Sequence, residues 1–274
     1  MTGAVDPAAL SELAEYTEGG ACADLLRCAP PEWNFHAEIT SAGVLLVAPG
    51  LDIPLFNRLA GVGLKQPATE QDIDTALATF SSAGIRHYAI QVSPTVRSRE
   101  IETWLADRGL SAAGDNWAKV IRDAAPAAAV QTDLRIQRID PSSSEEFARV
   151  ACEGFRMPPH LRPWFAATVG RPTWHHYLAF DGPAAVAAAA LRVEDRVGWL
   201  GVATTLPSHR RRGAQTALMA RRIDDARALG CEWFVTETGE DRPQRPNPSY
   251  HNMMRAGFRL LYQRPNFMSR RDRT

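Results

Sequence analysis

The sequence predicts a mixed α/β fold made of two lobes, each a central mixed sheet flanked by helices. The main observation is a repeat, because both halves run through strand, helix, strand, helix and strand in the same order. Gly84, which ends an expected helix, has its counterpart 146 residues later at Gly230. Gly109 and Gly257, which end the next pair of helices, lie 148 residues apart. We therefore expect two lobes that share one architecture.

An alanine-rich joint lies between the two halves. Residues 124–129 read Ala-Ala-Pro-Ala-Ala-Ala, a low-complexity composition typical of a linker. The chain of 274 residues is long enough for two modest domains. We expect one lobe at residues 1–125 and the other at residues 132–274.

Composition and charge exclude several classes of protein. The 31 Lys and Arg residues balance 31 Asp and Glu residues, so bulk electrostatics does not indicate a nucleic-acid partner. Four cysteines lack C-x-x-C spacing, so we expect neither a disulfide framework nor a bound metal. No apolar run is long enough to span a membrane and no leader pattern opens the sequence, so we expect a cytoplasmic monomer or homodimer.

Local signals define the elements of the first half. Asp6 followed by Pro7 starts a helix, which we expect to stop at the pair Gly19 and Gly20. Thr69 has the spacing of a capping box and starts another helix. Further elements are strands at residues 44–48, 87–92 and 117–121 and a helix at residues 98–108.

The second half contains one stretch in which propensity and context disagree. Residues 184–190 are mostly alanine, but they lie between two turn signals, so we predict a strand. His175 and His176 are neighbours on an expected strand and face opposite ways, so they cannot jointly hold a metal. We expect residues 157–172 to cover a cleft. Further elements are strands at residues 134–136, 197–202 and 232–237 and helices at residues 141–150, 214–229 and 249–255.

A basic loop, residues 206–213, connects an expected strand to an expected helix. Three arginines, Arg210, Arg211 and Arg212, precede the helix, although cations are disfavoured at a helix N-terminus. A bound polyanion would remove this conflict, because the loop N–H groups and the positive helix end converge on one point. The pattern therefore predicts an anion site.

This loop resembles the pyrophosphate loop of the GNAT acetyltransferase superfamily, Q/R-x-x-G-x-G/A. Arg210 fills the first position and Gly213 the fourth, whereas Gln215 departs from the small residue of the sixth. The resemblance extends from about Leu134 to the C-terminus, and the first half resembles a degenerate copy, as in tandem GNAT proteins laid out like mycothiol synthase. Because the first half lacks the arginine-rich loop, we expect it to bind no cofactor.

The resemblance implies acetyl-CoA as cosubstrate, without a metal. It implies that the end of one strand pairs with the pantetheine arm and that the loop and the following helix turn hold the pyrophosphate, with a serine of a later helix also in contact. The corresponding residues are Ala203, Thr204, Thr205, Arg210, Arg211, Arg212, Gly213, Ala214, Gln215, Thr216 and Ser249.

The reaction that the resemblance implies is direct attack of an amine on the thioester, which needs a base and a proton donor. Glu237 ends the strand beside the loop strand and is our candidate base. The family's tyrosine position falls on Met253, so Tyr250, one turn earlier, is the candidate donor to the leaving thiolate.

We expect an acetyltransferase that acts on a small-molecule amine. The alternative from another class is a non-catalytic CoA-binding sensor or scaffold, which Met253 at the tyrosine position keeps open. Nucleic-acid binding through residues 210–212 is disfavoured, because one short patch on a neutral chain lacks interleaved aromatics.

Overall fold

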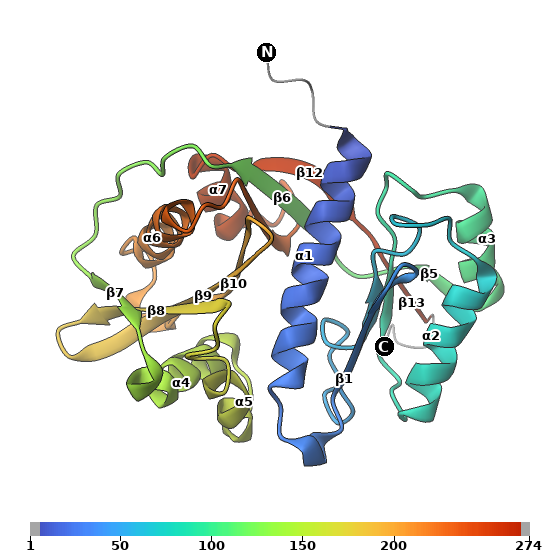
Figure 1. The fold of residues 1–274 in the computed structure, drawn as a ribbon, viewed down its shortest axis with the longest axis horizontal. Coiled ribbons are helices and arrows are strands. Elements are labelled where there is room, and N and C mark those ends of the chain that lie inside the picture. Colours follow the sequence, from blue (N-terminus) through green and yellow to red (C-terminus); the bar gives the residue numbers. More distant parts are fainter. Residues whose placement is uncertain (1–5, 270–274) are drawn as a thin grey trace.

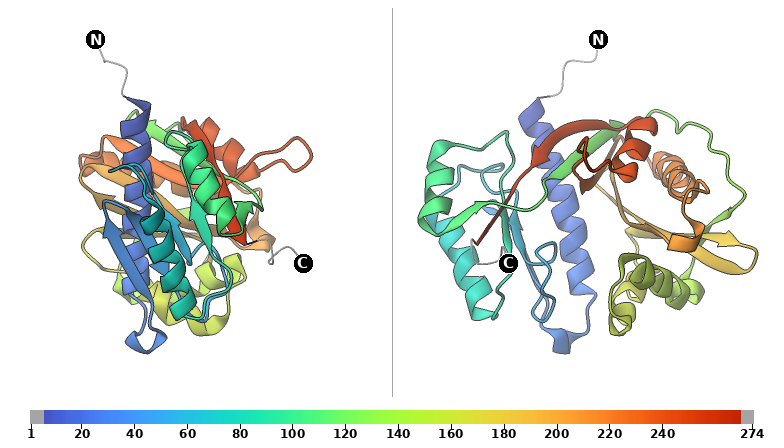
Figure 2. Two further views of the ribbon diagram at one scale, coloured as in Figure 1. Left: turned by 90° about the vertical axis from the view of Figure 1, so that its right-hand side faces the viewer. Right: turned by 180° about the vertical axis from the view of Figure 1, so that it is seen from behind.

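Helix α1, Pro7–Arg27, stands between the two lobes (Figures 1 and 2) in the computed structural model, which describes residues 6–269. It begins at Asp6 and Pro7 as predicted, but the predicted stop at Gly19 and Gly20 is wrong. A Cβ on Gly19 would lie 2.6 Å from Val44 Cγ2, so the glycine lets the helix pack closely on a strand. Tertiary packing therefore outweighs the low helix propensity of the glycine pair.

The first sheet contains six strands among the described residues, in the order β1-β2-β3-β4-β13-β5. Helices α2 (Glu70–Ser82) and α3 (Arg99–Asp107) pack on it through Ile73, Phe80 and Leu105. Thr69 and Asp72 form the predicted capping box at the start of α2. The strands are β1 (His36–Thr40), β2 (Gly43–Val47), β3 (Arg58–Ala60), β4 (Ala89–Gln91), β5 (Leu110–Ala112) and β13 (Asn266–Ser269).

The second sheet contains seven strands among residues 6–269, in the order β12-β6-β11-β10-β9-β8-β7. Helices α4 (Ser144–Phe155) and α5 (Arg162–Ala166) share one core with α1, and α6 (Ala214–Ala228) and α7 (Pro248–Arg255) share another. The strands are β6 (Trp117–Asp123), β7 (Arg135–Ile139), β8 (Trp174–Asp181), β9 (Ala184–Glu194), β10 (Val197–Thr205), β11 (Trp233–Gly239) and β12 (Arg259–Arg264). Short 3-10 turns lie at Pro31–Trp33, Pro141–Ser143, Pro159–Leu161 and Pro207–His209.

The alanine-rich strand prediction is confirmed. β9 pairs with β8 on one side and β10 on the other, and Ala185, Ala188 and Ala190 are buried. Small side chains on a central strand allow the helices on both faces to approach closely. The turn signals on either side therefore decide the structure where propensity alone would favour a helix.

The two sheets exchange strands. β6, from the first half of the chain, lies between β11 and β12 of the second sheet, and Figure 1 shows it beside β12. β13, from the end of the chain, lies between β4 and β5 of the first sheet. The predicted division at residues 125 and 132 is thus a division of the chain and not of the sheets, because strand pairing is set by long-range contacts.

The predicted repeat is visible in the strand order. β3 and β4 are parallel with α2 between them along the chain, and β10 and β11 are parallel with α6 between them. Two mixed sheets flanked by helices therefore follow one plan, as predicted. Among residues 6–269, no helix has the length and apolar character needed to cross a membrane.

Candidate functional site

The neighbouring strands β10 and β11 separate partway along their length. Their pairing covers only Val197–Trp199 against Trp233–Val235, although β10 continues to Thr205. At the point of separation the register with β9 shifts between Gly201 and Thr204, and Val202 has a φ of +47°. Such a bulge bends a strand away from its neighbour and leaves part of its backbone unpaired.

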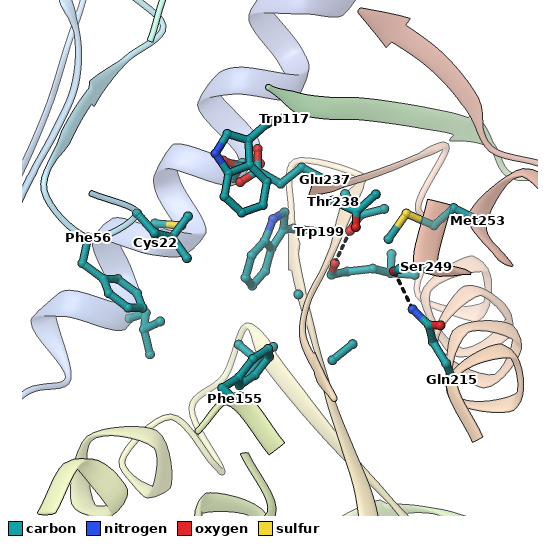
Figure 3. Close-up of a pocket in the computed structure, with 18 of the residues that line it drawn as sticks. Cys22, Phe56, Trp117, Phe155, Trp199, Gln215, Glu237, Thr238, Ser249 and Met253 are labelled. Carbon is teal, nitrogen blue, oxygen red and sulfur yellow. Dashed lines mark hydrogen bonds between the residues drawn. The ribbon is translucent and has the colours of Figure 1, made fainter. Parts of the chain in front are cut away.

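A cavity of about 400 Å³ opens where the strands separate and reaches the junction of the two lobes (Figure 3). The second lobe contributes Ala203 and Met253 to its walls. The first lobe contributes Cys22 from α1 and Phe56 and Arg58 from the β2–β3 connection and β3. Both halves of the chain therefore build this cavity.

The three arginines of the basic loop differ in their surroundings. Arg212 forms ion pairs with Asp133 and with Asp181, the latter at 2.6 Å, so its charge is neutralised within the protein. Arg210 and Arg211 are exposed, and no described carboxylate forms an ion pair with either. Two of the three predicted phosphate contacts are thus available to a ligand.

The helix after the loop begins without a side-chain cap. Gly213 is the N-cap of α6 with a φ of +82°, and the first turn, which includes Ala214 and Thr216, carries no acidic residue. A Cβ on Gly213 would lie 3.0 Å from the Gln131 carbonyl oxygen. Glycine is therefore required here by the positive φ and by the close approach of the Gln131 backbone. The N–H groups of the first turn of α6 have no partner within the helix.

Gln215, the departure from the family pattern, connects two helices. Its amide donates to Ser249 Oγ at 2.6 Å, and its carbonyl accepts from Asn252 Nδ2 at 2.6 Å. Gln215 and Ser249 both line the cavity, so this bond fixes α7 against α6 beside the cavity (Figure 3).

The three residues predicted to contact the cofactor at the end of β10, Ala203, Thr204 and Thr205, have different surroundings. Ala203 lines the cavity, whereas Thr204 lies against α4, because a Cβ on Gly154 would sit 2.3 Å from Thr204 Oγ1. The Thr205 carbonyl accepts from Arg210 Nε at 3.3 Å. Thr205 therefore ties the strand end to the basic loop.

Glu237 lies on the cavity wall and belongs to a buried cluster of six charges. Its carboxylate is 2.6 Å from Arg264, 3.1 Å from Lys119 and 3.4 Å from Arg58. The remaining carboxylates, Glu15 and Glu18, come from α1 and pair with the same cations. Three positive and three negative groups thus compensate one another across the lobe junction, as buried charges require.

The two carboxylates on the cavity wall have opposite pKa shifts. Burial by itself raises the pKa of Glu237, but Lys119, Arg264 and Arg58 outweigh it and hold that pKa well below its usual value. Burial and then the neighbouring Glu237 raise the pKa of Glu18 in spite of the same cations. Glu18 is therefore the better proton acceptor of the pair, and the cations argue against Glu237 as the base.

The structure does not bring Tyr250 to the cavity. Ser249 and Met253, four residues apart on one face of α7, line the cavity, whereas Tyr250 packs partly buried against the core beside α6. A one-residue step turns the side chain by about 100° around a helix. The candidate donor therefore faces away from the predicted reaction site.

Sequence analysis missed the first-lobe side of the site. Glu18 and Arg58 of the first lobe line the cavity, and so does Arg222 of α6 in the second lobe, whose pKa burial lowers to about 10. Lys119 could have indicated this side of the site, because it is the one charged residue in the predicted strand at residues 117–121. A charge on a buried strand needs a buried partner of opposite charge. Among residues 6–269, no group of three or more His, Cys, Asp or Glu could hold a metal ion.

Comparisons with known proteins agree with this geometry. Residues 140–253 match the model of the acetyltransferase (GNAT) family. No curated protein matches the sequence significantly. A GCN5-related N-acetyltransferase from Kribbella flavida has a similar structure, with a TM-score of 0.65, 15% identity, and coverage of 97% of this chain and 97% of that one.

Two other solved structures have the same arrangement. A tandem GNAT protein from the clavulanic acid biosynthesis pathway has a TM-score of 0.62 at 16% identity, covering 95% of this chain and 93% of its own. A GCN5-related N-acetyltransferase from Sphaerobacter thermophilus has a TM-score of 0.60 at 15% identity, covering 97% of this chain and 93% of its own. At such identities, these likenesses show the fold.

The matched acetyltransferase domain and the similar structures indicate an acyltransferase, in agreement with the separated parallel strands and the basic loop. Residues 140–253, in the second half, carry the match to the GNAT acetyltransferase family, and the whole chain shares its fold with solved structures that include a tandem GNAT protein.

Proposed function

We propose that this protein transfers an acetyl group from acetyl-CoA to the amine of a small molecule by direct attack. The observation that carries the proposal is an uncapped helix N-terminus beside exposed arginines, next to a cavity between separated strands. An anion there would satisfy N–H groups that the protein leaves unpaired.

The residues present fit a CoA molecule. Arg210, Arg211 and the N–H groups of the first turn of α6 would hold its pyrophosphate. The unpaired backbone of β10 beyond Gly201 would pair with the amide groups of the pantetheine arm, as an added strand does. Acetyl-CoA supplies the acyl group as a thioester.

The chain would contribute positioning and proton transfer. The amine nitrogen bonds to the thioester carbonyl carbon, the carbon–sulfur bond breaks, the amine loses one proton and the sulfur gains one. We assign this proton to Glu18, with Glu237 kept ionised as an attraction for the incoming ammonium, which releases its first proton to water before the attack. Glu18→Gln should lower turnover more than it changes the KM for acetyl-CoA, and an unaltered pH–rate profile would contradict this assignment.

Ser249 replaces Tyr250 as the proposed donor to the departing sulfur. Its hydroxyl lines the cavity and is held by Gln215. Ser249→Ala should therefore lower turnover, while Tyr250→Phe should leave it intact, and the reverse result would restore the tyrosine.

Two measurements test the proposed function. Calorimetry should give one acetyl-CoA site per chain, and a thiol-release assay should show transfer to members of an amine panel. Two equivalent sites would contradict the assignment of binding to the second lobe alone. Binding with slow hydrolysis and no amide product would instead favour a CoA-binding sensor.

The four cysteines are free thiols in the structure, and a cytoplasmic location stays our prediction.

A further inference from the structure

We infer that the acceptor is a primary amine on an apolar body, held between the two lobes, and not a sugar amine or a polyamine. This inference rests on the proposed function and concerns the part of the same cavity that lies away from α6 and α7. It follows from the walls, the rim and the hydrogen bonds of that cavity.

The walls at the lobe junction are apolar and aromatic. α1 contributes Leu25, the β2–β3 connection contributes Leu55 and Phe56, and the second sheet contributes Trp199. Phe165 of α5 completes this side, which confirms that residues 157–172 cover a cleft. Burial of an apolar ligand group against such walls is favourable in proportion to the area removed from water.

The rim carries two exposed apolar side chains from opposite lobes. Ile53 is 38% exposed and Phe155 is 44% exposed, although both are large hydrophobic residues. Ile53 lies between β2 and β3 and Phe155 ends α4, and both line this one cavity. Exposed apolar groups gathered at a cavity mouth are typical of a binding site for an apolar ligand.

The polar groups on the walls already have partners within the protein. Gln215 bonds to Ser249, Thr236 donates to the Leu200 carbonyl at 2.6 Å, and Arg222 donates to the Ala190 carbonyl at 2.9 Å. The hydroxyls of a sugar would therefore exchange bonds with water for few bonds with the protein, which is unfavourable.

The charges on the walls also argue against a polyamine. Each of the two carboxylates, Glu18 and Glu237, is within 4 Å of three cations. Arg222 adds a positive charge, and its guanidinium donates to the carbonyl oxygens of Leu218, Ala190 and Gly201. The further ammonium groups of a polyamine would thus find no uncompensated negative charge on these walls.

An apolar body also helps the chemistry. Removal of an ammonium from water into an apolar pocket lowers its pKa, so a larger fraction becomes the neutral nucleophile. The neutral nitrogen forms the bond to the thioester carbon as the carbon–sulfur bond breaks. The N–H proton that the nitrogen loses in forming the amide passes to Glu18. The same walls that select the acceptor therefore ease the proton loss that the attack requires.

Acetyl transfer by the full chain to four amines tests the inference: 2-phenylethylamine, ethylamine, spermidine and glucosamine. We expect kcat/KM for 2-phenylethylamine to exceed each of the others by roughly 30-fold or more, since burying an aromatic ring contributes about 2 kcal/mol or more. Equal or greater activity with spermidine or glucosamine overturns the inference and leaves the proposed function intact. Acetyl-CoA binding with no transfer to any amine overturns the proposed function itself.

Substitutions at the rim of the cavity provide a second test of the inference. Ile53→Ser and Phe155→Ser should each reduce the preference for 2-phenylethylamine over ethylamine about fivefold to tenfold, because each removes apolar contact area. The matched control is Leu260→Ser, since Leu260 is 37% exposed on β12 and does not line the cavity. A preference that falls equally in the control, or in neither rim variant, overturns the inference.

Discussion

The helices α2 and α6 occupy equivalent places in the two lobes, but their N-termini are built in opposite ways. α2 begins with Thr69, whose side chain accepts from the Asp72 N–H while the Asp72 carboxylate accepts from the Thr69 N–H. α6 begins with Gly213, which has no side chain to offer. One helix satisfies its own N-terminal N–H groups, and the other leaves them for an anion.

The space beside the two helices differs in the same sense. A Cβ on Gly61, the first-lobe counterpart of Gly201, would lie 3.3 Å from the Tyr16 ring, which fills that space. Lys65 lies 4.0 Å above the same ring. A Cβ on Gly201 would lie 1.8 Å from the Trp199 ring, but this ring is itself part of the cavity wall, because the strands separate here and the cavity opens. The two lobes therefore differ in helix capping and in the separation of the strands, and the cavity opens in the lobe where the helix is uncapped and the strands separate.

Separation of the lobes should produce the largest effect. Residues 130–274 alone lack β6, the strand that joins β12 to β11, and lack α1, which covers an apolar core. We expect this fragment to be insoluble or to unfold without cooperativity, as judged by gel filtration and circular dichroism. Co-expression with residues 1–129 should restore a folded complex. A fragment that is monomeric, as stable as the whole chain and fully active would contradict the strand exchange.

The buried charges at the lobe junction should come next in size. Lys119→Met leaves the buried Glu18 and Glu237 with one cation fewer, which should lower the free energy of unfolding by about 3–5 kcal/mol in a urea titration. The control is Arg108→Met, which removes the more exposed pairs with Glu70 and Asp74 in the first lobe and should cost far less. Equal losses would mean that the six charges are not coupled.

Charge reversal in the basic loop should abolish most of the affinity for CoA. Arg210→Glu combined with Arg211→Glu removes two charge-assisted contacts to phosphate, so we expect the Kd to rise roughly 100-fold in calorimetry. Lys65→Glu makes the corresponding change in the first-lobe loop and should leave the Kd unchanged. If both variants bind CoA like the wild type, the basic loop is ordinary surface.

Substitutions at the third residue of α6 and of α2 should have the smallest effects on CoA binding and on stability, and they compare the two helix N-termini directly. Thr216→Asp puts a carboxylate at the position in α6 that Asp72 holds in α2, so it should weaken CoA binding about fivefold to tenfold through repulsion. Asp72→Asn should lower stability by a few tenths to about 1 kcal/mol and leave CoA binding unaltered. If the first lobe held the cofactor, Asp72→Asn would change CoA binding and Thr216→Asp would not.

Elements with local signals could be predicted from the sequence. The capping box at Thr69, the loop and glycine before α6, and the turns around the alanine strand each depend on residues within a few positions of one another. The helix stop at Gly19 and Gly20 was predicted wrongly for the opposite reason, because a contact with Val44 from a distant strand permits the helix to continue.

By itself, the sequence determined the order of the elements, the repeat, the basic loop and the class of enzyme. These features depend on local propensity and on a short motif whose residues are neighbours. Only the tertiary structure decided that β6 and β13 change sheets, that α1 brings Glu18 to the cavity, and that α7 turns Ser249 and Met253 toward it. Contacts between distant residues set these outcomes, with separations of 34 positions for Gln215 and Ser249, 101 for Glu18 and Lys119, and 175 for Gln91 and Asn266. The burial and compensation of charge then select among alternatives that local patterns leave equal.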